Sequence, residues 1–261
     1  MPTINSIKNR KYLFKWRNRL LPLTKELIKG MQGTEKKPDG TPVTAVDREI
    51  ELFLREEIKS NFPEDGIIGE EFPPHQPEAE NQWIIDPIDG TRALIAGVPT
   101  FTTLIALLKN GHPQFSMMLQ PVTGETWFGD NETTHYNGEA THCQKVETLA
   151  AAIFSTTSPQ LFRDADKPII DSIMQNARNC QLGEDGYAYG KLAKGDLHLV
   201  VESGLKPYDF LPLVPIVIGA GAIMTDWQGN PLTLESNGDV IAASSKALHK
   251  QALALLNPHD R

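Results

Sequence analysis

The sequence predicts an α+β fold built from layers of helices and sheets. Runs with the apolar spacing of helices are mixed with short apolar runs typical of strands, without a regular strand–helix–strand alternation. In the first half, Asn110-Gly111 separates two strand-like runs and indicates a hairpin, and Asn137-Gly138 marks another turn. Because hairpins join antiparallel strands, we expect layered sheets rather than a doubly wound parallel sheet.

The chain opens with a segment rich in Lys and Arg. Its first 25 residues contain no Asp or Glu, and their bases are Lys8, Arg10, Lys11, Lys15, Arg17, Arg19 and Lys25. We expect an opening helix with a basic, solvated face that is broken or kinked near Pro22. The alternative is an organellar presequence, since such segments are also basic and poor in acids.

A helix and several strands are expected next. Residues 46–59 carry apolar side chains at helical spacing, with Asp47 at or near the helix start. Ile67-Ile68 forms a short apolar segment that leads into Gly69-Glu70-Glu71. Trp83-Ile84-Ile85 has the pattern of a buried strand. Three further strands are predicted at residues 101–108, 114–119 and 125–129.

Beyond about residue 140 the pattern changes, and predicted strands and helices are mixed. Strands are predicted at residues 153–156 and 197–202, the second of them half-buried. Helices are predicted at residues 167–176, at 187–193 with Gly195 as its C-cap, and at 210–221. In the last of these, Pro212 and Pro215 fall in or near the first turns, where proline is tolerated. Residues 240–256 give one short strand and a final helix.

Composition narrows the class of protein. A chain of 261 residues can bury a large core in one or two compact units. No apolar run approaches the roughly 18–20 residues needed to cross a bilayer. Cys143 and Cys180 fit no zinc spacing, and we interpret them as small core residues in a reducing compartment. The net charge of −8 argues against nucleic-acid binding, so an anionic substrate would need a local attractor such as a bound cation.

The most informative stretch is Asp86-Pro87-Ile88-Asp89-Gly90-Thr91. It places two carboxylates three residues apart at the end of a predicted buried strand, with a proline that restricts the backbone between them. Paired acids in a dry pocket repel each other unless a cation neutralises them, which favours a metal site. The alternative is a surface Asx/Pro turn, because the same residue types also favour turns.

Three other acidic segments stand where a strand or loop meets a helix. They contain Asp47, Glu70 and Asp209. Each has a simpler explanation, because Asp47 and Asp209 could be helix N-caps and Glu70 could lie in a solvated loop. Single segments therefore do not establish a metal centre.

Taken together, these segments resemble the inositol monophosphatase family of magnesium-dependent phosphatases. Residues 83–91 resemble the family's first signature, and Tyr208-Asp209 followed by Pro212 and Gly219-Ala220-Gly221 resembles its second. The Gly-Glu-Glu and Pro-Val-Thr…Asp segments precede them in the expected order. The resemblance spans about residues 37–257. It implies a layered α-β-α-β-α sandwich of the inositol monophosphatase and fructose-1,6-bisphosphatase type. It also implies a single catalytic unit over 1–261, with subdomains of about 1–140 and 141–261.

The resemblance also implies a set of metal ligands. Glu70, Asp86 and the backbone carbonyl of Ile88 would hold one Mg²⁺. Asp86, Asp89 and Asp209 would hold a second, with Asp86 bridging the two, and Glu70 could support a weaker third ion. Oxygen ligands of this kind suit Mg²⁺.

By the same resemblance, Asp47, Thr91 and Glu70 are the expected catalytic residues. Asp47 and Thr91 would orient and deprotonate the attacking water. The backbone amides of Gly90 and Thr91 would hold the phosphate oxygens if they open a helix. No Ser, Cys or His nucleophile is required for such a reaction.

Within the family, the histidinol-phosphate phosphatase branch is the most similar. The similarity rests on Arg92 and on residues 96–108, 187–189 and 205–209. Arg92, Asp185 and Glu202 are the predicted contacts to the non-phosphate part of the substrate, since a carboxylate can pair with an amine or accept from hydroxyls. Departures from the family pattern occur at Leu94, Gly186 and Ala222, which weakens the substrate assignment.

We therefore expect a Mg²⁺-dependent phosphate monoester hydrolase that converts L-histidinol phosphate to L-histidinol in histidine biosynthesis. The alternatives are a phosphatase for myo-inositol monophosphate, one for a bisphosphate or 3′-phosphonucleotide, and a metal-binding regulatory module without turnover. The expected partner is a small phosphorylated metabolite, with no nucleic acid and no membrane. The resemblance implies a homodimer, and we expect a cytoplasmic location.

Overall fold

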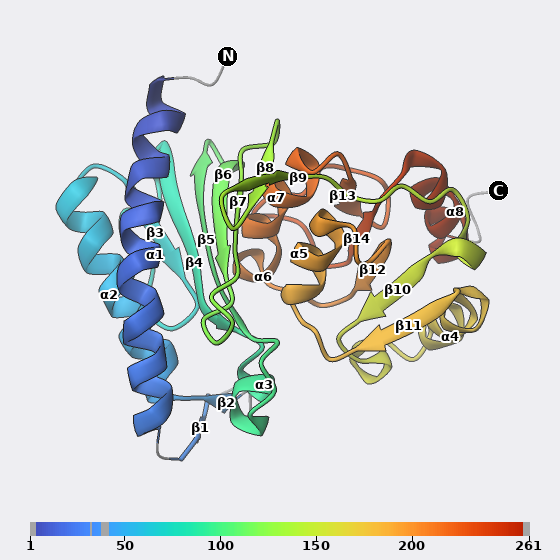
Figure 1. Ribbon diagram of the computed structural model, residues 1–261, viewed down its shortest axis with the longest axis horizontal. Coiled ribbons are helices and arrows are strands. Elements are labelled where there is room, and N and C mark those ends of the chain that lie inside the picture. The colour runs from blue at the N-terminus through green and yellow to red at the C-terminus, as the bar shows by residue number, and fades with distance from the viewer. Residues whose placement is uncertain (1–3, 32, 38–41, 258–261) are drawn as a thin grey trace.

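Two β-sheets and three layers of helices alternate across the molecule, which confirms the predicted α-β-α-β-α order (Figure 1). The computed structural model describes residues 4–31, 33–37 and 42–257. The helices described are α1 (Ile4–Gly30), α2 (Ala45–Asn61), α3 (Thr91–Ala96), α4 (Lys167–Asn176), α5 (Tyr187–Lys194), α6 (Pro207–Phe210), α7 (Val214–Gly219) and α8 (Lys246–Leu256). Short 3-10 turns occur at η1 (Leu149–Ala151), η2 (Pro159–Leu161) and η3 (Leu211–Leu213).

The first sheet is a seven-stranded meander whose first pair is parallel. Its strands, in spatial order, are β3 (Gly66–Gly69), β4 (Asn81–Asp89), β5 (Thr102–Lys109), β6 (His112–Leu119), β7 (Thr126–Gly129), β8 (Thr134–Tyr136) and β9 (Glu139–Thr141). Side chains alternate along β4, so Trp83 and Ile85 pack with α1 and α2 while Ile84 packs with the middle helices. The hairpin predicted at Asn110-Gly111 is confirmed.

The second sheet contains five strands in the order β11 (Asn179–Leu182), β10 (Ile153–Thr156), β12 (Leu199–Glu202), β14 (Val240–Ala243) and β13 (Ile223–Asp226). The strand predicted at 197–202 is confirmed as β12, but the prediction that it is half-buried was wrong, because all four residues of β12 are buried. β12 lies between two neighbouring strands and has helices on both faces. Val200 packs toward the middle layer, while Leu199 and Val201 pack toward α4 and α8.

The opening helix is confirmed, and it is not broken at Pro22, so the alternative of a break there was wrong. α1 continues through Pro22 to Gly30. Pro22 and Asn18, the residue whose carbonyl loses its helical donor, are both exposed, so water can satisfy that carbonyl. The buried side chains of Trp16, Leu20 and Thr24 hold the helix on the sheet on either side of the proline. Lys11, Lys15 and Arg19 are exposed as expected, while the side chains of residues 4–10 lie outside the described part.

The apolar segment predicted as one helix at residues 210–221 is three short pieces. α6, η3 and α7 follow one another from Pro207 to Gly219. Pro212 and Pro215 each lack the N–H that a continuous helix would require at that place, so the chain restarts a turn near each of them. The result places Asp209 in the first turn of α6, close to the first sheet.

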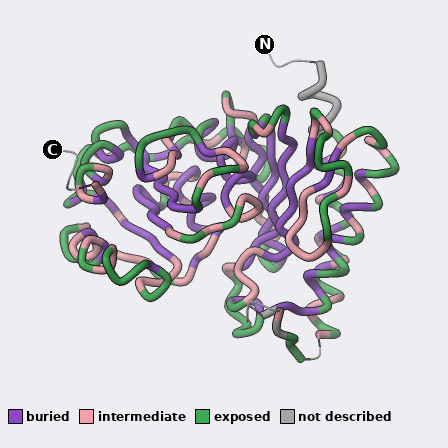
Figure 2. The backbone as a smooth tube through the Cα atoms, turned by 180° about the vertical axis from the view of Figure 1, so that it is seen from behind, coloured by how far each residue is buried: buried purple, intermediate pink, exposed green. Residues whose placement is uncertain are grey.

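A small two-stranded ribbon, β1 (Glu35–Lys36) and β2 (Pro42–Val43), precedes α2. Figure 2 shows that burial is concentrated in the sheets and the middle helices, with exposure on the outer faces.

Cys143 is buried, but Cys180 on the edge strand β11 is only half-buried, which corrects the prediction that both are core residues. Within the described residues, none of the helices has both the length and the apolar composition that a membrane crossing demands.

Candidate metal centre

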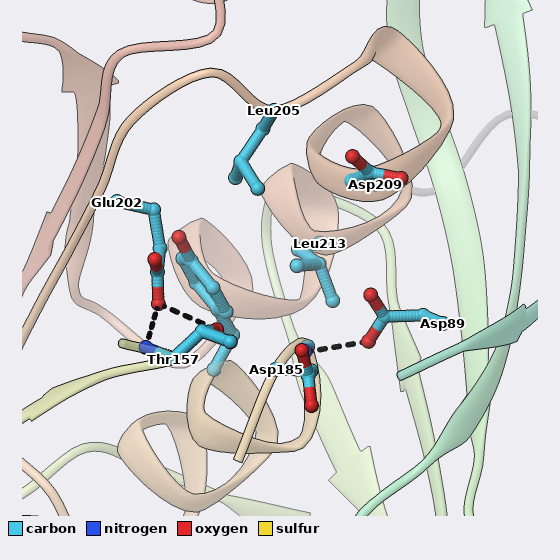
Figure 3. Close-up of a pocket in the computed structure, with 9 residues that line it drawn as sticks. Asp89, Thr157, Asp185, Glu202, Leu205, Asp209 and Leu213 are labelled. Atoms are coloured by element: carbon cyan, nitrogen blue, oxygen red, sulfur yellow. Dashed lines mark hydrogen bonds between the residues drawn. The ribbon is translucent and has the colours of Figure 1, made fainter. Parts of the chain in front are cut away.

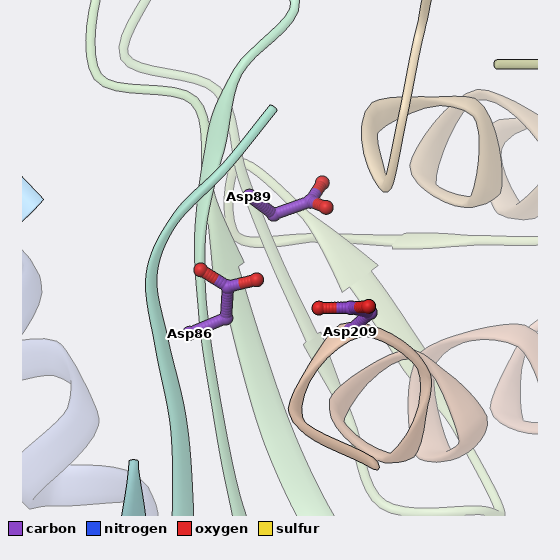
Figure 4. A group of neighbouring side chains, drawn as sticks. All are labelled: Asp86, Asp89 and Asp209. Atoms are coloured by element: carbon purple, nitrogen blue, oxygen red, sulfur yellow. The ribbon is translucent and has the colours of Figure 1, made fainter. Parts of the chain in front are cut away.

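The two acids of the Asp-Pro-Ile-Asp stretch lie at the end of β4. Asp86 pairs with Leu104 of β5, whereas Asp89 pairs with Thr102, so three steps on β4 face two steps on β5. Residues three apart on a regular strand point to opposite faces. The bulge adds one residue to β4 between the two acids. Both carboxylates therefore point toward the same side of the sheet, as Figure 4 shows. Pro87 suits such a position because it has no N–H to contribute to the ladder.

Asp209 completes a group of three carboxylates. It lies in the first turn of α6, where its Oδ2 accepts the backbone N–H of Lys206 at 2.8 Å. One carboxylate oxygen from each of Asp86, Asp89 and Asp209 lies within 4.8 Å of the others (Figure 4). The structure thus brings together three of the acids that the sequence predicts as ligands.

Burial and mutual repulsion make this group unfavourable without a cation. Burial, followed by the charges of Glu70, Asp89 and Asp209, raises the pKa of Asp86 well above its usual range. Burial raises the pKa of Asp209 to about 6. The Oδ1 atom of Asp86 is buried without a hydrogen-bond partner in the described part of the chain. An unpartnered carboxylate oxygen among other carboxylates fits a hard divalent cation.

Glu70 lies beside this group, immediately after β3. Its Oε1 atom contacts the ammonium of Lys37 at 2.6 Å, and Lys37 also contacts Glu71 at 2.6 Å. Burial raises the pKa of Glu70, while Lys37 opposes this effect. The charge of Glu70 in turn raises the pKa of Asp86, which places the two groups close together. Sequence reasoning missed Lys37, because no motif marks it.

Asp47 and Thr91, predicted as a pair, contact each other across 44 residues of sequence. The Thr91 hydroxyl lies 3.2 Å from Asp47 Oδ1 and 3.2 Å from the carbonyl oxygen of Ile88. A hydroxyl has one proton, so it donates to one of these acceptors at a time and can accept from another group. Asp47 is not the N-cap of α2. Thr44 has that role, and Asp47 Oδ2 accepts from the Thr44 backbone at 2.8 Å.

Gly90 and Thr91 open α3, as the resemblance required. Gly90 has a φ of +85°, a left-handed conformation that glycine adopts without strain. The helical hydrogen bonds begin with the N–H of Ala93, which donates to Gly90 O at 2.9 Å. The amides of Gly90 and Thr91 precede that bond and are of the kind that binds anions at helix starts.

A pocket extends from the carboxylate group into the second half of the chain (Figure 3). It is lined by Asp89, Thr157, Asp185, Gly186, Tyr189, Glu202, Leu205, Asp209 and Leu213. The predicted substrate residues Asp185 and Glu202 therefore share one pocket with Asp89 and Asp209. Arg92 is exposed on α3 and does not line it. Its charge nevertheless reaches Asp185, whose pKa burial raises and Arg92 lowers.

Glu202 is held firmly at the end of β12. It is buried and accepts the Thr157 backbone N–H at 2.6 Å and the Thr157 hydroxyl at 3.0 Å. Burial raises its pKa to about 8, although the Thr157 bonds oppose the shift. A cationic partner would stabilise the charged form of a carboxyl group whose pKa is raised in this way, so Glu202 is suited to bind a cation.

Comparison with known proteins identifies the family. The model of the inositol monophosphatase family matches residues 17–261. The chain belongs to this family. Bifunctional phosphatase IMPL2, chloroplastic, of Arabidopsis thaliana is 40% identical over 233 residues, covering 85% of this chain and 67% of the relative. A histidinol-phosphatase of Chlorobaculum parvum is 30% identical over 227 residues, covering 86% of this chain and 87% of the relative.

A solved structure agrees with this assignment. An inositol monophosphatase from Zymomonas mobilis superimposes with a TM-score of 0.83 at 39% identity, covering 95% of this chain and 98% of the other. Inositol monophosphatase family phosphatases act on small phosphorylated substrates and are generally Mg²⁺-dependent. The carboxylates of this member fit that ion, because they offer oxygen donors alone and leave Asp86 Oδ1 unpartnered.

Several pocket residues of this family member were not predicted as site residues from sequence. Thr157 and Tyr189 are the most informative of them. Thr157 follows β10 and fixes Glu202. Tyr189 lies on α5, and its hydroxyl is buried without a hydrogen-bond partner among the described residues. Thr157 belongs to no motif, and Tyr189 lies in the stretch 187–189 without a role assigned to it from sequence, so the packing of α5 and β10 around the pocket reveals their place in the site.

The raised pKa of Asp209 predicts a pH-dependent effect on stability in the metal-free protein. The folded state holds a proton up to about pH 6, whereas the unfolded state releases it near pH 4, so this group lowers stability as pH rises through that interval. Asp209→Asn removes the effect. We expect the EDTA-treated variant to melt above the wild type at about pH 7, with a smaller difference at about pH 5. Thermal melts of both proteins measure this, and a difference independent of pH would contradict it.

Proposed function

We propose that this family member is a Mg²⁺-dependent phosphate monoester hydrolase whose substrate is L-histidinol phosphate. The observation that carries the proposal is one pocket with two kinds of acid. Asp89 and Asp209 belong to the candidate metal centre, while Asp185 and Glu202 line the same pocket outside that group of three carboxylates.

In this proposal, Glu70, Asp86, Asp89, Asp209 and the carbonyl of Ile88 would hold two or three Mg²⁺ ions. When bound, the ions neutralise the phosphate, lower the pKa of the attacking water and stabilise the leaving oxygen. The buried, repelling carboxylates support this role, since burial and mutual repulsion disfavour their charged forms and a bound cation would offset both effects.

The other residues of the site position the reactants. Thr91 accepts a hydrogen bond from the attacking water and passes its own proton toward Asp47, 3.2 Å away. The Thr44 bonds fix the orientation of Asp47. The amides of Gly90 and Thr91 hold the phosphate oxygens at the start of α3.

Two carboxylates in the pocket support a cationic leaving group over a neutral one. The amine of histidinol would pair with Glu202 or Asp185 in a charge-assisted hydrogen bond. Arg92 lies outside the pocket, and we propose that it tunes Asp185 electrostatically. The histidinol-phosphatase of C. parvum supports the same substrate class by similarity.

Myo-inositol monophosphate is the second candidate substrate. The similarity to the inositol monophosphatase from Z. mobilis favours it, and Glu202 can accept hydrogen bonds from hydroxyl groups. A regulatory module without turnover is less well supported, because the Asp47–Thr91 contact has no evident use in metal binding alone.

A comparison of substrates tests the proposal. The purified protein with Mg²⁺ is assayed for phosphate release from L-histidinol phosphate, myo-inositol 1-phosphate and a 3′,5′-bisphosphonucleotide. We expect the highest kcat/KM for L-histidinol phosphate. A higher value for the inositol or nucleotide ester would replace the proposed substrate, and hydrolysis of none of a wider panel would favour the regulatory module.

Substitution of Glu202 should weaken recognition of the leaving group without affecting the chemical step. Glu202→Gln keeps the shape but loses the charge, so kcat/KM for L-histidinol phosphate should fall by about 10–100-fold, the value of one charged hydrogen bond. Hydrolysis of p-nitrophenyl phosphate, which has no amine, should change little. Glu125→Gln is the matched control, because Glu125 accepts hydrogen bonds from Tyr136 and Tyr187 and is not among the residues that line the pocket. Equal losses on both esters would contradict the assignment.

We also propose that residues 1–261 act as one catalytic unit. The part up to about residue 140 supplies Asp86 and Asp89, and the part from about 141 supplies Asp209, Asp185 and Glu202. The homodimer and the cytoplasmic location stay predictions.

A further inference from the structure

The Gly69-Glu70-Glu71 segment is held by a buried carboxylate from another element. Glu51 of α2 is fully buried, and its Oε2 accepts the backbone N–H of Glu71 at 2.7 Å. Its Oε1 accepts from Arg55 Nε at 2.7 Å. Arg55 in turn donates from Nη2 to the carbonyl oxygen of Phe72 at 2.8 Å. The Glu51–Arg55 pair therefore binds the backbone N–H of Glu71 and the backbone carbonyl of Phe72, which directly follow Glu70.

Gly69 is the residue that admits this carboxylate. A Cβ atom at Gly69 would lie 2.0 Å from Glu51 Oε1 and 2.5 Å from Glu51 Cδ. The glycine is therefore required for close approach and not for a turn. The first residue of the Gly-Glu-Glu segment thus has a structural partner 18 residues earlier in the chain.

A general stabilising role does not account for this arrangement. Buried ion pairs contribute little net stability, because desolvation offsets their attraction. Of the three hydrogen bonds that Glu51 and Arg55 make here, two are to the backbone of the segment that carries Glu70. The pair therefore fixes the position of that backbone. Glu51 also lies one helical turn from Asp47 on α2, and Asp47 contacts Thr91. One face of α2 therefore contacts the segments of both Glu70 and Thr91.

We propose that Glu51, held in place by Arg55, is a positioning residue that sets Glu70 for metal binding. The inference rests on the proposed function, in which Glu70 is a ligand. Glu51 acts on metal affinity through the backbone of residues 69–72 and takes no part in the chemical step. Lys37 contacts Glu70 and Glu71 through their side chains, whereas Glu51 and Arg55 contact the backbone of Glu71 and Phe72.

The test measures Mg²⁺ binding to the metal-free full chain by calorimetry, with kcat and KM as a second readout. In Glu51→Gln the amide nitrogen cannot accept a hydrogen bond, so one of the two bonds to Oε1 and Oε2 is lost. We expect the Mg²⁺ dissociation constant to rise by about 10–100-fold, as for other residues that orient metal ligands. The substrate KM and the kcat at saturating Mg²⁺ should stay within about threefold of the wild type.

Glu57→Gln is the matched control on the same helix. Glu57 is also a shielded carboxylate, and it accepts from Trp16 Nε1 at 2.9 Å and contacts Lys15 at 3.2 Å, away from residues 69–72. Its replacement should lower the melting temperature and leave the Mg²⁺ dissociation constant unchanged. An equal change in both variants would show a general effect of helix stability and overturn the inference.

Two further variants separate the possible failures. Glu70→Gln tests the ligand itself, and unchanged Mg²⁺ binding in that variant would overturn the proposed ligand set. If Glu70→Gln binds Mg²⁺ weakly while folded Glu51→Gln binds as the wild type, the positioning role is wrong and the proposed function stands.

If Glu51→Gln does not fold, the variant Arg55→Lys tests the positioning role in its place. It keeps the charge but cannot reach both Glu51 and Phe72 as the guanidinium does, so weaker binding is expected and wild-type binding would overturn the inference.

Discussion

Asp86→Asn should abolish Mg²⁺-dependent phosphate release, with a fall in kcat/KM of about 10³-fold or more, given the several kcal/mol that a catalytic metal supplies. Asp86 is the buried centre of the carboxylate group, and its pKa responds to the charges of Glu70, Asp89 and Asp209. Asparagine keeps the shape but offers a single neutral oxygen. Phosphate release and Mg²⁺ calorimetry on the purified variant measure the effect.

The same substitution should stabilise the metal-free protein. Removal of one buried charge relieves repulsion within the group, and each kcal/mol of relief corresponds to about 2–4 °C in melting temperature for a chain of this size. Asp171→Asn on the exposed face of α4 is the control and should change neither property. Full activity in Asp86→Asn, or a lower melting temperature in EDTA, would contradict the account of this site.

Thr91→Ala is expected to lower kcat by about 10²-fold, a typical contribution from a positioned proton-transfer group. In the proposed mechanism, the hydroxyl links the attacking water to Asp47, which it contacts together with the carbonyl of Ile88. Mg²⁺ binding and the substrate KM should change little, because the carboxylate group and the α3 amides remain. Steady-state kinetics at saturating Mg²⁺ separate kcat from KM.

Thr91→Ser provides the rescue, since serine keeps the hydroxyl in place. We expect the serine variant to recover most of the kcat lost in the alanine variant. Asp47→Asn is a weaker test, because Asp47 also takes part in the capping box of α2 and its loss would affect folding. Wild-type kcat in Thr91→Ala, or a loss in Thr91→Ser as large as in Thr91→Ala, would remove Thr91 from the water-activating role.

Local signals predicted most of the elements well. The helix at residues 167–176 has an apolar stripe and a proline in its first turn, and the strand at residues 153–156 is apolar, so both were found at their observed bounds. β11 was missed because Asn179–Leu182 alternates over four residues only, with Cys180 and Leu182 as its apolar side chains, and lies at a sheet edge. Its strand state comes from parallel pairing with β10, which is a tertiary effect.

Proline had opposite outcomes at two places for a physical reason. Pro22 is exposed, and water replaces the lost bond, so α1 continues. Pro212 and Pro215 lie three residues apart in a buried segment, where the missing donors cannot be replaced by water, so the chain divides into α6, η3 and α7. Burial therefore determines whether the helix continues through a proline, and the burial of a residue cannot be read directly from a single sequence.

The candidate site was predicted as a set of acids but not as a geometry. The bulge between Asp86 and Asp89 depends on pairing with β5, and the contacts of Lys37 and Glu51 depend on how the ribbon and α2 pack against β3. Such partners are distant in sequence and carry no motif. The sequence therefore predicted which side chains carry chemistry, while the fold supplied the residues that orient them.

The most direct test of the central claim is phosphate release from L-histidinol phosphate by EDTA-treated wild-type protein during a Mg²⁺ titration. We expect no release without Mg²⁺ and saturable release as Mg²⁺ is added, since in the proposed function the ions held by Asp86, Asp89 and Asp209 neutralise the phosphate and activate the water. Release in EDTA equal to that with Mg²⁺ would contradict it.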